Sequence, residues 1–323
     1  MIPLELYYNR LNASLNDFIE AVEYVDVSKG APASLKVTLC NADGRFTRGW
    51  ACTKGDALAL QFGAATPEQL SISEVSVQIV PRLVTWTASA IPATTAAPSG
   101  RGNGSPPPKS GALVTDARSW QQPMRNARLS AVARTVCNEC GLTLKYVAKS
   151  DPRVSYVGRC RETGYRLLTR LCRRYGLGLR ATASDVQIIS RPSVSDGAQK
   201  AIDLPLSKIE AFSNTAALAA SKVQSARMDP RSGKVVRAAS GDGDGAPISL
   251  VFDADDADSI YSQAVLDAVA AELTVVPDAR FVAGSILQIP GYGLRQVTEM
   301  RYKRTGDGET MTLQTRGAGV QSF

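Results

Sequence analysis

Cysteine is the residue type in this chain with the clearest capacity for chemistry. Four of the six cysteines are spaced as C-x2-C-x19-C-x11-C, at Cys137, Cys140, Cys160 and Cys172. Cys137 and Cys140 share one face of a predicted helix, and Cys172 lies on the buried face of a second one. If the two helices pack together, the four thiolates converge on a four-cysteine iron–sulfur cluster or a zinc site. Only one C-x2-C pair is present, so buried free thiols or a disulfide remain open alternatives.

Histidine is absent from the chain. Its absence removes the commonest general base, every serine–histidine triad and every histidine metal ligand. Four carboxylates lie in or just after the stretch that holds these cysteines but follow no motif with a defined spacing: Glu139, Asp151, Glu162 and Asp185. We therefore predict that the protein is not an enzyme, and we assign no catalytic residue.

The formal net charge is +7, and the excess is concentrated between Lys149 and Arg180. Nine Lys or Arg residues in this stretch face only two carboxylates. Such a surface either meets nucleic acid or an acidic protein, or is the solvated side of a helix. Aromatic side chains suited to base stacking are not interleaved with the charge, which favours the solvated helix. If this surface is instead an interface, Arg170, Arg173 and Arg174 are its candidate residues.

Residues 160–189 form the element that positions these side chains. Apolar and aromatic residues recur there at three- and four-residue spacing, at Tyr165, Leu168, Leu171, Cys172 and Tyr175, which predicts one face of a helix. Gly176 ends this helix as a residue suited to the left-handed cap position. Two short strands, 177–182 and 186–189, then predict a hairpin.

Residues 117–190 as a whole predict a small α+β module. Besides the helix and hairpin, a helix is expected to begin after Trp120 and to end at Gly141. Short strands are expected at 142–147 and 154–157. The preceding residues, 89–116, are mostly Pro, Gly, Ser, Thr and Ala and predict a loop or linker.

Residues 1–88 and 191–323 predict two β domains. Apolar residues alternate in 2–8, 34–39, 58–62 and 71–80, and again in 207–212, 222–227, 296–302 and 310–316. Turn signals such as Gly306-Asp307-Gly308 separate the strands. A Gly/Asp-rich loop is expected at 235–245 and a helix at 259–273. The predicted fold is mainly β, with two small antiparallel tube-like β-barrels flanking the α+β module.

Membrane insertion and export are not expected. No run approaches the ~18–20 apolar residues that span a bilayer. The first ten residues lack the basic and then apolar pattern of a signal peptide. We therefore expect synthesis in a cytoplasm and no membrane span.

Three groups of local signatures occur in a fixed order along the chain. The first is residues 41–45 (NADGR) with Trp50 and 54–56 (KGD). The second is Ser119-Trp120 ahead of a helix, with 162–175 ending in Tyr-Gly. The third is 283–289 (AGSILQI) followed by the strand pair 296–316. In this order the chain resembles the hub proteins of phage tail baseplates, the late-control D family and its relatives in other contractile injection systems.

The resemblance implies a structural role in the virion tail or baseplate, after synthesis in the bacterial cytoplasm. It implies a homotrimeric ring in which three copies present six similar barrels. Such a ring adapts the sixfold tail tube protein to a trimeric central spike protein and contacts other baseplate proteins. The genome or a tape-measure protein occupies its channel. Some members of the family are understood to carry an iron–sulfur cluster, and a disulfide that forms after virion release is the alternative.

Two functions of other classes stay open beside the hub. One is a peptidoglycan-acting tail hydrolase that uses the carboxylates of the middle module. The other is a nucleic-acid-binding module that uses the arginine-rich helix at 159–180, for which steep salt dependence of DNA binding is expected.

Overall fold

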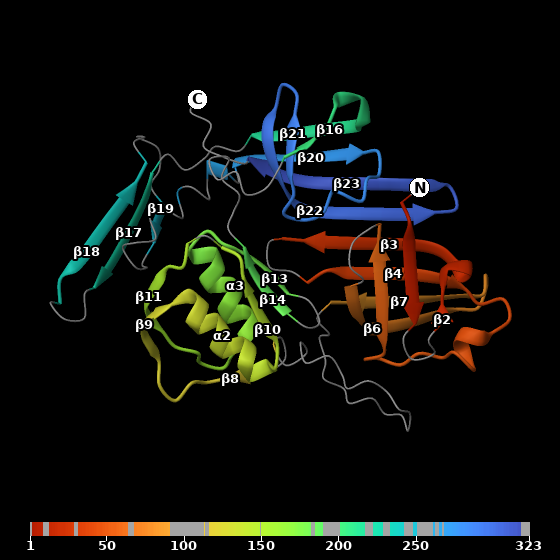
Figure 1. The fold of residues 1–323 in the computed structure, drawn as a ribbon, viewed down its shortest axis with the longest axis horizontal. Helices are drawn as coiled ribbons and strands as arrows, with labels where there is room; N and C mark the ends of the chain where they lie inside the picture. The colour runs from red at the N-terminus through yellow and green to blue at the C-terminus, as the bar shows by residue number, and fades with distance from the viewer. Residues whose placement is uncertain are drawn as a thin grey trace.

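The computed structural model describes residues 2–8, 13–28, 32–63, 68–90, 113, 116–148, 150–181, 185–189, 201–216, 222–228, 233–241, 248–250, 261, 265–266 and 268–317. Three parts follow one another along the chain: an N-terminal β region, an α+β module and a C-terminal β region. Figure 1 shows the module to one side of the large sheet that the two β regions form. Most of the predicted 89–116 linker lies outside the described residues, and the proposed domain boundaries stay a prediction.

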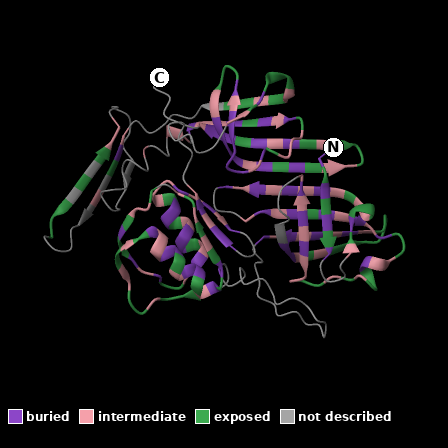
Figure 2. Cartoon of the chain, in the orientation of Figure 1, coloured by how far each residue is buried: buried purple, intermediate pink, exposed green. Residues whose placement is uncertain are grey.

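Most strands of the N-terminal β region alternate between buried and more open positions. Its strands are β1 (Leu4–Tyr8), β2 (Ala13–Ser14), β3 (Ile19–Val27), β4 (Ser34–Cys40), β5 (Ala57–Phe62), β6 (Glu68–Gln78) and β7 (Leu83–Ser89). The alternation is visible in Figure 2 as regular colour changes along the strands. Because successive side chains point to opposite faces, one face is apolar and packs inward.

This sheet curves over its own apolar face. Two strands, β6 and β5, separate β7 from β1 in the sheet order. Even so, the rings of Tyr8 on β1 and Trp86 on β7 lie 5.3 Å apart. Tyr24 on β3 and Phe62 on β5 are likewise 5.5 Å apart. Contacts between such distant strands require the sheet to bend round a filled interior.

The C-terminal β region continues the same sheet. Its strands are β15 (Ile202–Asp203), β16 (Ile209–Ala216), β20 (Val269–Val275), β21 (Ile286–Ile289), β22 (Gly293–Thr305) and β23 (Gly308–Gly317). Strand β22 pairs antiparallel with β3, with Tyr302 opposite Tyr24. The two β regions therefore share one 13-stranded sheet and one apolar core. The predicted mainly β fold with an α+β insert is confirmed, while the closure of two separate barrels stays a prediction.

A separate three-stranded sheet interrupts the C-terminal region. It consists of β17 (Val223–Met228), β18 (Val235–Ser240) and β19 (Ile248–Leu250), in the order β18-β17-β19. Figure 1 shows it standing apart from the large sheet, at the far left. The prediction of a loop at 235–245 is wrong for 235–240, because this stretch pairs with β17 along its whole length. Residues 242–245 lie outside the described part.

The α+β module has a core of its own. It contains β8 (Ala117–Arg118), β9 (Met124–Arg128), α2 (Leu129–Cys140), β10 (Thr143–Tyr146), β11 (Arg153–Val157), β12 (Glu162–Thr163), α3 (Gly164–Arg174), β13 (Gly178–Ala181) and β14 (Asp185–Ile189). Strands β10, β14 and β13 form one small sheet, and β9 pairs with β11 in a two-stranded ribbon. The apolar faces of α2 and α3 share one buried cluster with this sheet. The predicted hairpin after α3 and both short strands are confirmed.

Two predicted helices are shorter than expected. The helix expected after Trp120 begins only at Leu129, because Met124–Arg128 forms strand β9 against β11. The helix expected at 259–273 ends before Val269–Val275, which forms strand β20. Only residues 261, 265, 266 and 268 of that helix are both described and helical. Within the described residues, no helix is long and apolar enough to cross a membrane.

Candidate functional site

Helix α2 places the first two predicted cysteine ligands and one carboxylate. Its buried residues recur at helical spacing: Leu129, Val132, Ala133, Val136, Cys137 and Cys140. The carboxylate of Asp151 accepts hydrogen bonds from the backbone N–H (2.9 Å) and the hydroxyl (2.7 Å) of Ser130, and so satisfies one backbone N–H of the first turn. The helix ends at Gly141, whose φ of 66° is left-handed, as predicted.

Helix α3 places the predicted interface arginines and the fourth cysteine. Thr163 caps its N-terminus, with the Oγ1 atom accepting a hydrogen bond from the backbone N–H of Arg166 at 3.3 Å. Arg173 and Arg174 lie in the last turn, where cations complement the helix dipole. Gly176, with a left-handed φ of 67°, then turns the chain into the hairpin, as predicted.

The structure brings three of the four predicted metal ligands into one core and leaves the fourth outside it. Cys137, Cys140 and Cys172 are buried, whereas Cys160 is exposed, and all are free thiols. Burial raises the pKa of both Cys137 and Cys172 to about 12, which disfavours the thiolate that a metal needs. No group of three or more His, Cys, Asp or Glu side chains in the described residues could hold a metal ion.

The four thiols thus do not form a convergent ligand set in this conformation, and we derive no chemistry from a metal. The iron–sulfur or zinc cofactor stays a prediction. Metal and acid-labile sulfide analysis of anaerobically purified protein tests it directly.

The three predicted interface arginines lie in different environments. Arg170 is exposed and pairs with Glu162, with Nη2 2.9 Å from Oε2. Arg173 is exposed. Arg174 is half-buried, and its guanidinium carbon lies 5.4 Å from the ring centroid of Tyr175. Helix α3 therefore does not present these arginines as one uniform open surface, and their role at an interface stays a prediction.

The four candidate carboxylates all take part in contacts within the module. Asp151 accepts from Ser130, Glu162 pairs with Arg170, Asp185 accepts from Lys145 at 2.6 Å, and Glu139 pairs with Arg159. These contacts cap a helix or join neighbouring elements. They give each carboxylate a structural role.

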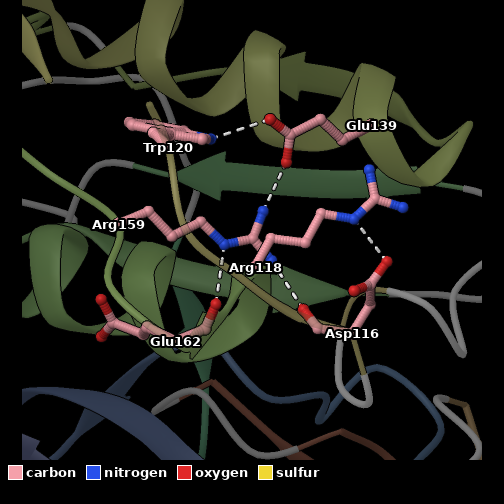
Figure 3. Close-up of polar contacts among 6 residues, drawn as sticks. All are labelled: Asp116, Arg118, Trp120, Glu139, Arg159 and Glu162. Carbon is pink, nitrogen blue, oxygen red and sulfur yellow. Dashed lines mark hydrogen bonds and ion pairs between the residues drawn. The ribbon is translucent and has the colours of Figure 1, made fainter. Parts of the chain in front are cut away.

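One buried arginine organises the centre of the module, as Figure 3 shows. Arg159 is only 2% exposed. Its Nη1 group pairs with Glu139, its Nε donates to the carbonyl of Glu162 at 2.7 Å, and its Nη2 donates to the carbonyl of Asp116 at 2.7 Å. The indole N–H of Trp120 donates to the second oxygen of Glu139 at 2.8 Å. A buried charge that is paired and hydrogen-bonded in this way holds three segments together.

This network forms one wall of a pocket of about 500 Å³. Trp120 and Glu139 line it from the network, together with Met124 at the start of β9 and the neighbouring Gln121 and Gln122. Both glutamines are exposed. The pocket lies in the size range of ligand sites. Its lining combines the apolar residues Trp120 and Met124 with two amide residues and the charged residues Arg118 and Glu139.

Sequence reasoning did not single out Arg159 or the pocket. Arg159 lies in a run of arginines that reads as a solvated surface, and nothing in its spacing separates it from exposed neighbours. Trp120 was part of a local signature, but its partner Glu139 is 19 residues away along the chain. The network depends on packing that brings α2 against the loop before α3.

Comparisons with known proteins place the whole chain within one kind of fold. No protein-family model matches it, and no curated protein matches its sequence. Among solved structures, a tail protein from Neisseria meningitidis MC58 is similar over 98% of this chain and 96% of its own, with a TM-score of 0.72 and 11% identity. The 43 kDa tail protein of prophage MuSo2 from Shewanella oneidensis is similar over 99% of this chain and 100% of its own, with a TM-score of 0.64 and 14% identity.

A third similar structure comes from a secretion system. It is a type VI secretion component from E. coli that is described as structurally similar to the T4 bacteriophage tail proteins gp27 and gp5. It covers 100% of this chain and 75% of its own, with a TM-score of 0.58 and 10% identity. The predicted resemblance is therefore confirmed at the level of the fold: over nearly its whole length, the chain has the fold of these phage tail proteins and of the type VI secretion component.

Proposed function

We propose that the protein is a structural baseplate hub of a phage tail or a related contractile injection system. In this proposal three copies form a ring that adapts a sixfold tail tube to a trimeric central spike, and the ring also contacts other baseplate proteins. The genome or a tape-measure protein occupies its channel. The protein is made in the bacterial cytoplasm, acts in the virion tail or baseplate, and carries out no catalysis.

The observation that carries the proposal is the joining of the two β regions in one sheet through β3 and β22. A single chain thereby presents two β regions side by side. Three such chains in a cyclic ring provide six β regions, which is the number that a sixfold tube requires. The similarity to tail proteins over nearly the full chain supports this arrangement.

An exposed apolar tip on the N-terminal β region offers a contact for assembly. At the end of the β6–β7 hairpin, Val77, Ile79 and Val80 are 53%, 79% and 84% exposed. Neighbouring apolar groups of this size favour burial in an assembly. We assign this tip to the contact between copies in the ring.

The experiment is to measure the mass of the purified protein by light scattering and to image it by negative stain. A mass of three times the 34.3 kDa monomer and threefold rings with six lobes are expected. Ile79→Asp with Val80→Asp should return the protein to monomers. Val147→Asp, at a position in the module that is 67% exposed, is the matched control and should leave the rings intact. Monomers in every preparation of the unaltered protein, with and without its spike partner, would refute the hub.

A further inference from the structure

The α+β module carries a two-stranded ribbon on which positively charged side chains face one another across the two strands. In the β9–β11 pair, Arg128 lies directly opposite Arg153, and both are exposed. Like charges directly opposite on neighbouring strands destabilise a sheet. Arg125 follows on β9, opposite the exposed Tyr156. The ribbon thus concentrates three guanidinium groups on a short stretch of surface.

Little negative charge offsets these arginines. The Nη1 atom of Arg128 lies 3.8 Å from Oδ2 of Asp151, but that carboxylate already accepts two hydrogen bonds from Ser130. Neither Arg125 nor Arg153 has a side-chain hydrogen bond or ion pair with any of the described residues. The ribbon therefore has the capacity to bind carboxylates, which guanidinium groups bind in a planar, two-pronged geometry.

The pocket beside Trp120 adjoins this ribbon. Met124 is both the first residue of β9 and part of the pocket lining. The Arg159–Glu139 network fixes the Trp120 ring at the pocket wall, so little side-chain freedom remains to be lost on binding. Gln121 and Gln122 at the pocket provide amide groups that complement a peptide backbone.

We propose that the pocket and the ribbon form one docking surface for an acidic segment of a partner protein. An apolar side chain of that segment occupies the pocket beside Trp120, and its carboxylates pair with the ribbon arginines. An apolar anchor in a preformed pocket with charged groups around it is the usual arrangement of a strong protein contact. The proposal rests on the hub function and names the chemistry of one partner. All the residues of this surface come from one copy of the chain, so the surface does not require the ring.

An acidic peptide fits this surface better than a nucleic acid does. The ribbon strands have five residues each and span about 17 Å, which gives little length for tracking a phosphate backbone. Tyr156 is its one exposed aromatic residue, whereas single-strand binding uses a series of stacking platforms. Trp120 and Met124 in the pocket lining can also pack against an apolar side chain of a peptide.

The test is fluorescence anisotropy with labelled probes and the full-length protein at physiological salt. The probes are a peptide of alternating glutamate and leucine, its glutamine–leucine counterpart, and a single-stranded oligonucleotide of equal charge. We expect the acidic peptide to bind at least about tenfold more tightly than either of the other two. Equal or tighter binding of the oligonucleotide, or no binding of the acidic peptide, would overturn the proposal.

Matched variants locate the binding. Changing Arg125, Arg128 and Arg153 together to Gln should weaken peptide binding about tenfold or more. Changing Arg166, Arg170 and Arg173 on α3 to Gln removes the same charge and should change the affinity less than about threefold. Gln121→Ala with Gln122→Ala should weaken binding through the pocket alone. Equal losses in the two arginine variants would overturn the proposal, while ring formation in all of them would leave the hub function standing.

Discussion

The N-terminal β region and the α+β module are each built round one large buried side chain, but of opposite chemistry. Trp86, fully buried, lies among aromatic rings, 5.3 Å from Tyr8 and 5.6 Å from Phe46. Its indole N–H has no hydrogen-bond partner among the described residues. Arg159 is almost as deeply buried but is bound by one carboxylate and two carbonyl groups.

The comparison shows two ways of specifying a core. An aromatic cluster gains its stability from area and volume, so it responds to the size of what replaces a ring. A buried charge is stable only while its partners are present. Removing one member of the pair therefore destabilises the fold more than replacing both members together. The β region, with its broad apolar core, suits a rigid assembly element. The module holds its loops by polar contacts, and its outer face carries the docking surface proposed above.

Trp86→Ala tests the first half of the comparison and should have the largest effect. The substitution leaves a cavity at the centre of the aromatic cluster and should lower the free energy of unfolding by about 3–5 kcal/mol. Denaturant unfolding followed by circular dichroism measures it. Trp86→Phe keeps most of the volume and loses no hydrogen bond, so it should cost clearly less. Equal losses in both variants would mean that the cluster does not act through volume.

Arg159→Met tests the second half. It leaves the Glu139 carboxylate without its charged partner, and we expect a loss of about 2–4 kcal/mol, below the full value for a buried pair because Glu139 is 22% exposed at its side chain. Hydrogen exchange should show the loss in the module and not in the large sheet. Adding Glu139→Gln should recover part of the stability. No recovery in the double variant would show that Arg159 acts through packing alone.

The sequence was sufficient for elements whose signals are local. Alternating apolar residues predicted strands such as β1 and β4, and Gly141 and Gly176 ended their helices because they supply the left-handed conformation. The helix expected at 259–273 was predicted to end too late, because the alanine-rich stretch at its end fits both the helical period and the alternation of a strand. Ala271, Leu273 and Val275 are buried on alternate positions because β16 and β23 lie on either side.

Features that depend on distant partners could not be predicted. Strand β7 has no counterpart among the predicted elements, although Val84, Trp86 and Ala88 alternate, because its place between β4 and β6 is a long-range property. The pairing of β3 with β22 joins residues 272 to 282 positions apart. The burial of Arg159 likewise reflects three-dimensional neighbours, while its sequence context reads as surface.

The smallest change in stability is expected at Asp26, where the large sheet and the module meet. Asp26 on β3 is buried. Its Oδ2 atom accepts a hydrogen bond from the backbone N–H of Ala283 at 3.1 Å and lies 3.6 Å from Nη2 of Arg180 on β13. Its Oδ1 atom has no partner among the described residues. Burial raises the pKa of this carboxyl above its ordinary value, against the opposing pull of Arg180.

Asp26→Asn should therefore stabilise the protein at pH 7. Above the raised pKa the folded and unfolded states both carry the charge, and its burial lowers stability. As the pH falls through that pKa toward the ordinary value of 3.8, the folded state takes up the proton first and the penalty disappears. The advantage of the variant should shrink over this window in thermal unfolding. Asp43→Asn, at an exposed carboxyl whose pKa Arg45 lowers, should show no such advantage. A destabilised Asp26→Asn at pH 7 would mean that the attraction of Arg180 outweighs burial, and that charge also helps to fix the module on the sheet.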